Sequence, residues 1–180
     1  MSMSCNLCEL QGKYVGPIIN EKSNLLLLVD YPSPRDDERG VIFSALDHRA
    51  QTFFDALSLA KLDSDDVNIA AALRCVIKSK DIRTSLITDC ATRLLETMPH
   101  VEKILCYGVA TYCFMTGLPI KQVDEYRKDY TTMTIAGKER LIGCTYSLSL
   151  VGSSGCSACA RGTYTVLMAK DIKRIRKHTR

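Results

Sequence analysis

Four cysteines in the first half of the chain have a spacing that could hold a metal centre. Cys5 and Cys8 form a Cys-x2-Cys pair near the N-terminal end, and Cys75 and Cys90 follow further along. Four thiolates are the number that an iron–sulfur cluster or a structural zinc ion requires. The short pair is typical of such sites, whereas the distant pair could equally be core cysteines. The spacing alone leaves both interpretations open.

A second group of cysteines lies in the last quarter of the sequence. Cys156 and Cys159 repeat the Cys-x2-Cys spacing, and Cys144 precedes them. Three thiols without a nearby histidine are a weak basis for a second zinc or redox site, so we expect structural roles. Cys106 and Cys113 fall on an apolar strand and an apolar helix face, where buried thiols are ordinary.

The composition is that of a globular protein. The chain has 180 residues, of which 46% are hydrophobic and 24% charged. No apolar run approaches the roughly 18–20 residues that span a bilayer, and we expect no membrane partner. The N-terminal segment lacks the pattern of a secretory signal, which predicts a cytoplasmic protein, in the host cytoplasm if a phage encodes it. Nine cysteines, an odd number, also argue against a disulfide framework.

Positive charge is concentrated at the C-terminal end. The net charge is only +4, but the last eleven residues hold six basic residues against one acid, Asp171. The basic residues are Lys170, Lys173, Arg174, Arg176, Lys177 and Arg180. Such a segment is either a solvated helix end or a surface for nucleic-acid phosphates. For the second interpretation we take Lys173, Arg174, Arg176, Lys177 and Arg180 as the DNA-binding residues.

The elements that must position these residues alternate between strands and helices. Short apolar runs predict buried strands at Asn24–Asp30, Asp66–Leu73 and Glu102–Gly108, and alternation predicts a hairpin within Thr131–Tyr146. Apolar residues at helical spacing predict helices at Asp47–Ala60, Ile87–Met98, Val109–Thr116 and Thr163–Lys177. Such alternation predicts a single α/β domain over residues 1–180, with helices on both faces of a mostly parallel sheet.

In such a fold the ligand chemistry is found in the loops at the carboxyl ends of the strands. The first of these loops reads YPSPRDDERG, from Tyr31 to Gly40. Because two prolines and a glycine interrupt it, we predict no regular structure there.

Several motifs together resemble the iron–sulfur (family four) uracil-DNA glycosylases. That family opens with Cys-x-x-Cys, and follows its first strand with Gly-Glu-Ala-Pro-Gly, acidic residues, a glycine and a phenylalanine. This chain has VDYPSPRDDERGVIF, which aligns without gaps. The matching residues are Asp30 for the Glu, Pro32, Asp36 and Asp37, Gly40 and Phe43. Arg74-Cys75, Cys90 and the segment EKILCYGVAT also match the family in order.

The resemblance implies a fold, a cofactor and a site. The fold is a uracil-DNA glycosylase-like three-layer α/β/α domain, with an N-terminal iron–sulfur segment and a basic C-terminal helix. The cofactor is a [4Fe–4S] cluster held by Cys5, Cys8, Cys75 and Cys90, which would tie the N-terminal end to the sheet. The base pocket would contain Tyr31, Pro32, Phe43 and Ala71.

Two positions depart from the family's active site. The family reads uracil with an asparagine where this chain has Ala71, and it supports the departing base with a histidine where this chain has Ser147. Losing a polar base contact weakens discrimination by orders of magnitude, and losing one stabilising donor costs about 10²–10³ in rate. Asp30, the counterpart of the glutamate, is one methylene shorter. Asp30 and Ser147 are therefore the catalytic candidates, in an altered pocket.

Three functions fit this pattern. The first is a DNA-binding protein of this fold without normal uracil excision, accessory to replication, repair or transcription. By analogy with glycosylase folds borrowed by viruses, its partner would be a polymerase or other nucleic-acid machinery, and a phage or viral source would suit it. The second is a DNA N-glycosylase for a different or modified base, and the third is a protein-interaction module with a structural cluster.

Overall fold

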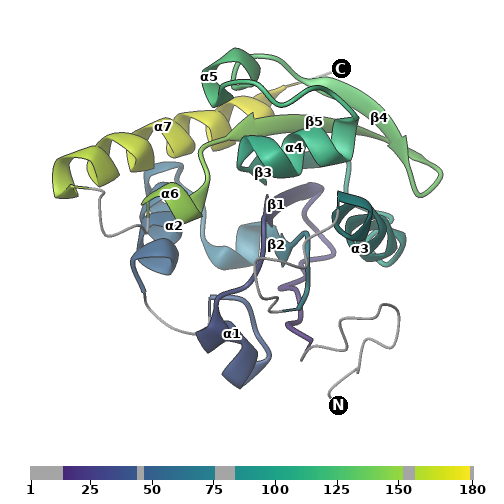
Figure 1. Ribbon diagram of the computed structural model, residues 1–180, viewed down its shortest axis with the longest axis horizontal. Coiled ribbons are helices and arrows are strands. Elements are labelled where there is room, and N and C mark those ends of the chain that lie inside the picture. The colour runs from purple at the N-terminus through teal and green to yellow at the C-terminus, as the bar shows by residue number, and fades with distance from the viewer. Residues whose placement is uncertain (1–13, 44–46, 76–83, 152–156, 179–180) are drawn as a thin grey trace.

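The structure, a computed structural model, describes residues 14–43, 47–75, 84–151 and 157–178. Its strands form one sheet with the order β2-β1-β3-β5-β4 (Figure 1). The strands are β1 (Leu25–Val29), β2 (Asn68–Ala71), β3 (Lys103–Tyr107), β4 (Thr131–Ile135) and β5 (Lys138–Thr145). All neighbouring pairs are parallel except β4–β5 at one edge. The predicted α/β class with a mostly parallel sheet is confirmed.

Helices cover both faces of this sheet (Figure 1). The helices are α1 (Pro34–Arg39), α2 (His48–Leu59), α3 (Thr84–Glu96), α4 (Val109–Thr116), α5 (Val123–Tyr126), α6 (Leu148–Val151) and α7 (Ala158–Lys177), with a 3₁₀ turn η1 at Ser64–Asp66. Helices α2, α6 and α7 pack on one face, and α3 and α4 on the other. The result is a three-layer arrangement around one sheet.

The run of leucines in β1 is explained by this double coverage. Leu25, Leu27 and Val29 contribute to the core beneath α2 and α7, whereas Leu26 and Leu28 contribute to the core beneath α3 and α4. Each of these residues is at most 3% exposed. A strand buried on both faces has no polar alternation, which is why the sequence shows a continuous apolar run.

The segment Tyr31–Gly40 corrects one prediction, because it contains helix α1. Pro34 occupies the first turn, where its missing N–H would have no intrahelical partner in any case. Ser33 caps the helix, accepting from the Asp36 N–H, and the Asp36 carboxylate accepts from the Ser33 N–H at 2.8 Å. Gly40 ends the helix in the left-handed conformation. The proline and glycine that predicted a loop are the boundaries of a short helix.

The remaining elements follow the predictions closely. The β4–β5 hairpin turns at Ala136-Gly137, whose φ angles of 52° and 73° are those of a tight hairpin turn. The C-terminal helix begins at Ala158, earlier than the predicted Thr163, because Ser157 caps it by accepting from the Ala160 N–H. Within the described part of the chain, no helix combines the length and the apolar character needed to cross a bilayer.

Arg140 on β5 is a buried charge that stabilises the end of α3. It is 1% exposed, and its guanidinium donates to the carbonyl oxygens of Leu95 at 3.0 Å, Met98 at 3.2 Å and Val101 at 2.6 Å. Leu95 lies in the last turn of α3, where a cation is favoured by the helix dipole, and Met98 and Val101 lie in the segment that follows the helix. Burial lowers the pKa of Arg140.

Candidate functional site

The carboxyl ends of β1, β3 and β5 bring Asp30 and Ser147 together. Asp30 follows the last residue of β1, and Ser147 lies two residues beyond β5. The Ser147 hydroxyl donates to Asp30 Oδ2 at 3.3 Å. Gly108, after β3, makes this approach possible: its φ is 111°, and a Cβ there would lie 3.3 Å from Ser147 Cβ. The two predicted catalytic candidates therefore share one site.

The carboxylate of Asp30 is surrounded by donors. Besides Ser147, the Ser149 hydroxyl donates to Oδ2 at 3.1 Å, and the Tyr31 N–H donates to Oδ1 at 3.2 Å. The Arg49 guanidinium forms an ion pair with Oδ1 at 3.6 Å. An ionised carboxylate has about four lone-pair positions. Three hydrogen bonds therefore leave about one position open to water, and the Asp30 side chain is 21% exposed.

Arg49 is a site residue that the sequence analysis missed. It lies in the first turn of α2, where Asp47 caps the helix and positions the arginine. Its Nη2 donates to the Tyr31 carbonyl at 3.0 Å, and its guanidinium lies 5.4 Å from the Tyr31 ring centroid. Its Nε is buried without a hydrogen-bond partner among the described residues. No spacing rule pairs Arg49 with Asp30, so only the fold reveals it.

Three of the predicted base-pocket residues lie near the backbone of Asp30. Ala71 ends β2 and pairs in register with Val29, the residue before Asp30, and is 3% exposed. Pro32 is buried, whereas Tyr31 is 38% exposed, and its hydroxyl oxygen lies 3.4 Å from the Ser149 hydroxyl. All three are therefore close in space to the Asp30 backbone.

Phe43, the fourth predicted base-pocket residue, has an unusual backbone conformation. Its φ of 56° is rare for a residue with a side chain. Its ring packs against Phe53 with centroids 4.5 Å apart and against Phe54 at 5.9 Å, so the residue is only 9% exposed. Non-glycine residues in this conformation cluster at functional sites. The ring is largely covered by its own aromatic neighbours.

Two of the four predicted cluster ligands lie in the described residues. Cys75 is 4% exposed and forms an isolated antiparallel bridge with Tyr14, and Cys90 on α3 is partly buried. The Val15 N–H donates to the Arg74 carbonyl at 2.7 Å, so the N-terminal segment runs beside Cys75. Cys5 and Cys8 lie outside the described residues. Among the residues that are described, no three His, Cys, Asp or Glu side chains gather as a metal site.

The basic residues of α7 divide into two kinds. Lys173, Arg174, Arg176 and Lys177 are all exposed, but Arg174 also has partners within the protein. Its Nη1 donates to the Arg127 carbonyl at 2.9 Å and lies 3.4 Å from Asp171 Oδ1. Arg180 lies outside the described residues. Of the predicted DNA-binding residues, Arg174 is thus the one whose side chain already has internal partners.

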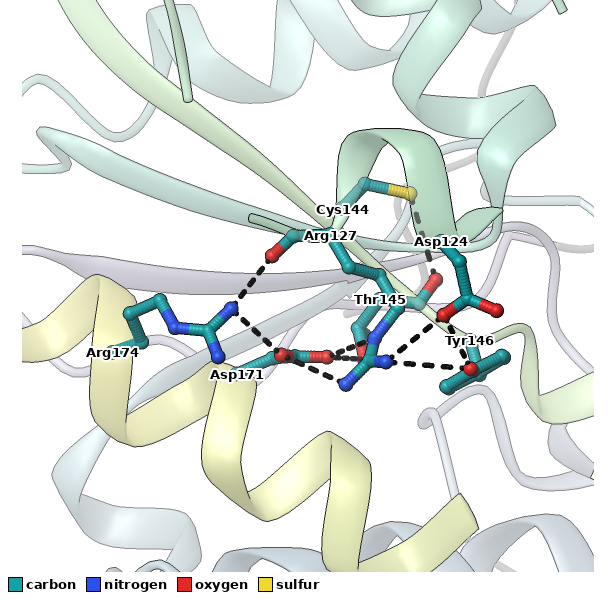
Figure 2. Close-up of polar contacts among 7 residues, drawn as sticks. All are labelled: Asp124, Arg127, Cys144, Thr145, Tyr146, Asp171 and Arg174. Carbon is teal, nitrogen blue, oxygen red and sulfur yellow. Dashed lines mark hydrogen bonds and ion pairs between the residues drawn. The ribbon is translucent and has the colours of Figure 1, made fainter. Parts of the chain in front are cut away.

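A polar network centred on the buried carboxylate of Asp171 fixes the chain just before Ser147 (Figure 2). Arg127 forms two hydrogen bonds to Asp171, Nε to Oδ2 at 2.8 Å and Nη2 to Oδ1 at 3.1 Å. Thr145, at the end of β5, donates to Asp171 Oδ2 at 2.7 Å. The Tyr146 hydroxyl donates to Asp124 at 2.6 Å, and Arg127 lies over the Tyr146 ring at 4.5 Å. The network joins α5, β5 and α7 and holds the two residues that precede Ser147.

Burial and hydrogen bonding set the ionisation of this network. Burial raises the pKa of Asp171 above its ordinary value, although the hydrogen bonds from Arg127 and Thr145 oppose the shift. The Tyr146 hydroxyl and Arg127 hold the pKa of Asp124 below its ordinary value. The sequence gives no signal for this network, because its members come from three separated segments.

The other described cysteines are buried in the core beneath α3 and α4. Cys106 and Cys144 are neighbours in the β3–β5 register, and Cys113 lies on α4. Burial raises the pKa of Cys144 to about 12 and that of Cys106 well above its ordinary value. The predicted core positions of Cys106 and Cys113 are confirmed. Cys144 lies in the core beneath α3 and α4, on the other face of the sheet from α7. Cys159 lies on α7. Cys156 is outside the described residues.

Comparison with known proteins gives no family for this chain. No protein-family model matches it, and no curated protein matches it significantly.

Proposed function

We propose that the chain is a uracil-DNA glycosylase-like [4Fe–4S] protein that binds DNA without normal uracil excision. The role would be accessory, in replication, repair or transcription. The proposal rests chiefly on the site at the carboxyl ends of the strands, where Asp30 and Ser147 are joined at 3.3 Å beside Ala71 and Tyr31. These are the residues that align with the active-site motifs of that family.

The chemistry of the site favours binding over excision. A glycosylase must read the edge of an extruded base and stabilise the charge that develops as the base departs. Ala71 has no polar atom with which to read a base edge, and Ser147 cannot become a cation. The Asp30 carboxylate is occupied by two serine hydroxyls, a backbone N–H and Arg49. The residues can hold a nucleotide through hydrogen bonds more readily than they can cleave its glycosidic bond.

The cluster is the second part of the proposal. The thiolates of Cys5, Cys8, Cys75 and Cys90 suit a [4Fe–4S] cluster, which would tie the N-terminal segment to the end of β2. The bridge between Tyr14 and Cys75 supports this, because it leads the chain from Cys8 toward Cys75. Tyr14 comes six positions after Cys8 in the sequence, a reach of at most about 20 Å.

One pair of assays tests the function. We expect labelled duplex DNA to bind with an affinity that falls as salt rises. We expect no release of uracil, or of any base from a panel of damaged and modified duplexes. Release of a modified base that is lost in Asp30→Asn would make the chain a glycosylase for that base. Absence of DNA binding at low salt would favour a protein-interaction module instead.

A further inference from the structure

Arg74 is a buried cation without a carboxylate partner among the described residues. The residue is 8% exposed, and its Nε is buried with no hydrogen-bond partner in the described part of the chain. Its Nη1 donates to the Tyr14 hydroxyl at 3.0 Å, and the guanidinium lies 5.0 Å from the centroid of the Tyr14 ring. None of the ion pairs between described residues includes Arg74.

Two other arginines of this protein show what a buried guanidinium usually has. Arg127 pairs with the Asp171 carboxylate through two hydrogen bonds, and Arg140 donates to the carbonyl oxygens around the end of α3. A tyrosine hydroxyl and a ring face neutralise no charge, and a buried charge is costly unless it is paired. The surroundings of Arg74 therefore suit an anionic neighbour.

Arg74 lies beside one of the proposed cluster ligands. It directly precedes Cys75, and Cys75 forms an antiparallel bridge with Tyr14, the residue whose ring the guanidinium covers. Directly opposite residues of an antiparallel pair lie on one face, with Cβ atoms about 4.5–5.5 Å apart. Tyr14 therefore lies between the guanidinium of Arg74 and the face on which Cys75 lies.

This arrangement fits an iron–sulfur cluster, because a cubane core held by four thiolates has a net negative charge. We infer that Arg74 is the cation that offsets part of this charge and raises the reduction potential of the proposed cluster. The inference rests on the cluster part of the proposed function. Reduction adds an electron to the cluster, so a nearby cation favours the reduced state. At an effective dielectric constant of about 20, a unit charge about 10 Å away changes such an equilibrium roughly tenfold.

The test measures the midpoint potential of the full chain, purified anaerobically with its iron, by dithionite titration followed by electron paramagnetic resonance. Arg74→Met and Arg74→Gln remove the charge, and each should shift the equilibrium about tenfold toward the oxidised state, about 59 mV for a one-electron couple. Arg74→Lys keeps the charge and should stay within about threefold of wild type. The control Lys170→Gln removes an exposed charge from α7, on the other face of the sheet from Cys90, and should match wild type.

The rate at which a chelator removes iron gives a second readout, which also serves for a cluster whose midpoint lies beyond the reach of dithionite. We expect iron release to be about tenfold faster in the two neutral variants, because they lack a charge partner of the cluster. Arg74→Lys and Lys170→Gln should release iron at the wild-type rate. Melting temperatures of all the variants show whether each one is folded.

The outcomes separate this inference from the proposed function. Wild-type protein without iron overturns both the inference and the cluster part of the proposed function. Neutral variants that keep the wild-type potential and iron-release rate overturn the inference and leave the cluster assignment intact. Equal changes in the neutral variants and in Arg74→Lys also overturn it, since the shape of the side chain would then matter and not its charge. Loss of iron from folded neutral variants, with iron retained at the wild-type potential in Arg74→Lys, supports it.

Discussion

The Ser147 hydroxyl donates to the Asp30 carboxylate at 3.3 Å across 117 positions of sequence. In the family resemblance, these two positions align with a histidine and a glutamate, and both side chains are smaller in this chain. The Ser147 hydroxyl is one of three hydrogen-bond donors to Asp30, with the Ser149 hydroxyl and the Tyr31 N–H.

The first prediction concerns uracil excision. The wild-type protein should release uracil at least about 10³-fold more slowly than an active glycosylase, because it lacks both the base-reading amide and the imidazole. Ala71→Asn combined with Ser147→His should produce measurable release from a uracil-containing duplex, since the introduced imidazole would lie beside Asp30. Adding Asp30→Asn to this pair should remove the gain. Efficient release by the wild type that disappears in Asp30→Asn would contradict the altered-pocket interpretation.

The second prediction concerns the cluster. Anaerobically purified protein should show a broad absorption band at about 400 nm and should contain about four iron atoms per chain. Cys75→Ser or Cys90→Ser should remove the iron, measured by metal analysis. Cys106→Ala is the matched control, because this thiol is buried in the core with a strongly raised pKa and should not be a ligand. One zinc and no iron in the anaerobic protein would rule the assignment out.

The sequence predicted the layers of the fold better than the contacts of the site. The apolar run of β1 and the helical stripe of α3 are local patterns, so their positions could be predicted from short windows. The same windows failed at α1, because Pro34 and Gly40 are as compatible with helix boundaries as with a loop. Local sequence patterns therefore predict which helices and strands form, but they do not fix the residues at which each element begins and ends.

Contacts between distant segments could be predicted only through the family resemblance. Asp30 and Ser147 were paired by their matches to motifs, and the fold brings them together. Arg49 matches no such motif and was missed, although it contacts both Asp30 and Tyr31. Asp171 appeared in the sequence only as the one acid in a basic segment, yet its buried carboxylate pairs with Arg127.

The third prediction concerns the pH dependence of stability. Because the pKa of Asp171 is raised in the folded state, the folded protein binds a proton more tightly than the unfolded chain does. The contribution of this group to stability is therefore full below the ordinary aspartate pKa of about 3.9, and falls as pH rises toward the folded-state pKa. The wild-type protein should therefore lose melting temperature relative to Asp171→Asn as the pH is raised from about 4. A wild-type melting temperature that rises relative to Asp171→Asn over the same pH change would mean that Arg127 outweighs burial and lowers the pKa.

The fourth prediction concerns the cap of α3. Arg140→Ala should lower the free energy of unfolding by about 2–3 kcal/mol, because it removes a buried side chain and the hydrogen bonds that its guanidinium makes to the carbonyls of Leu95, Met98 and Val101. Arg140→Lys should recover only part of this, since one ammonium cannot reach all the carbonyls that the guanidinium contacts. Chemical denaturation of the three proteins measures the difference. Arg93→Ala is the control, because it removes an exposed basic residue from the last turn of α3. It should lower the free energy of unfolding by less than about 1 kcal/mol.

The last prediction separates a DNA-binding role of α7 from a solvated helix end. Removing the end of α7 would be a poor test, since buried Ile175 and the contact of Arg174 with Arg127 would be lost with it. Lys173→Gln/Lys177→Gln changes only exposed side chains. Each phosphate contact contributes about 0.9 to the slope of log affinity against log salt, so the double variant should flatten the slope by up to about 1.8.

A salt titration on one labelled duplex measures this change, with Lys121→Gln/Lys128→Gln as the control that should keep the wild-type slope. The melting temperature of both variants should stay within a few degrees of wild type, because these side chains are exposed. If the two double variants give the same slope as wild type, Lys173 and Lys177 bind no phosphates. Their positive charge would then act only within the protein, by interacting favourably with the dipole at the C-terminal end of α7.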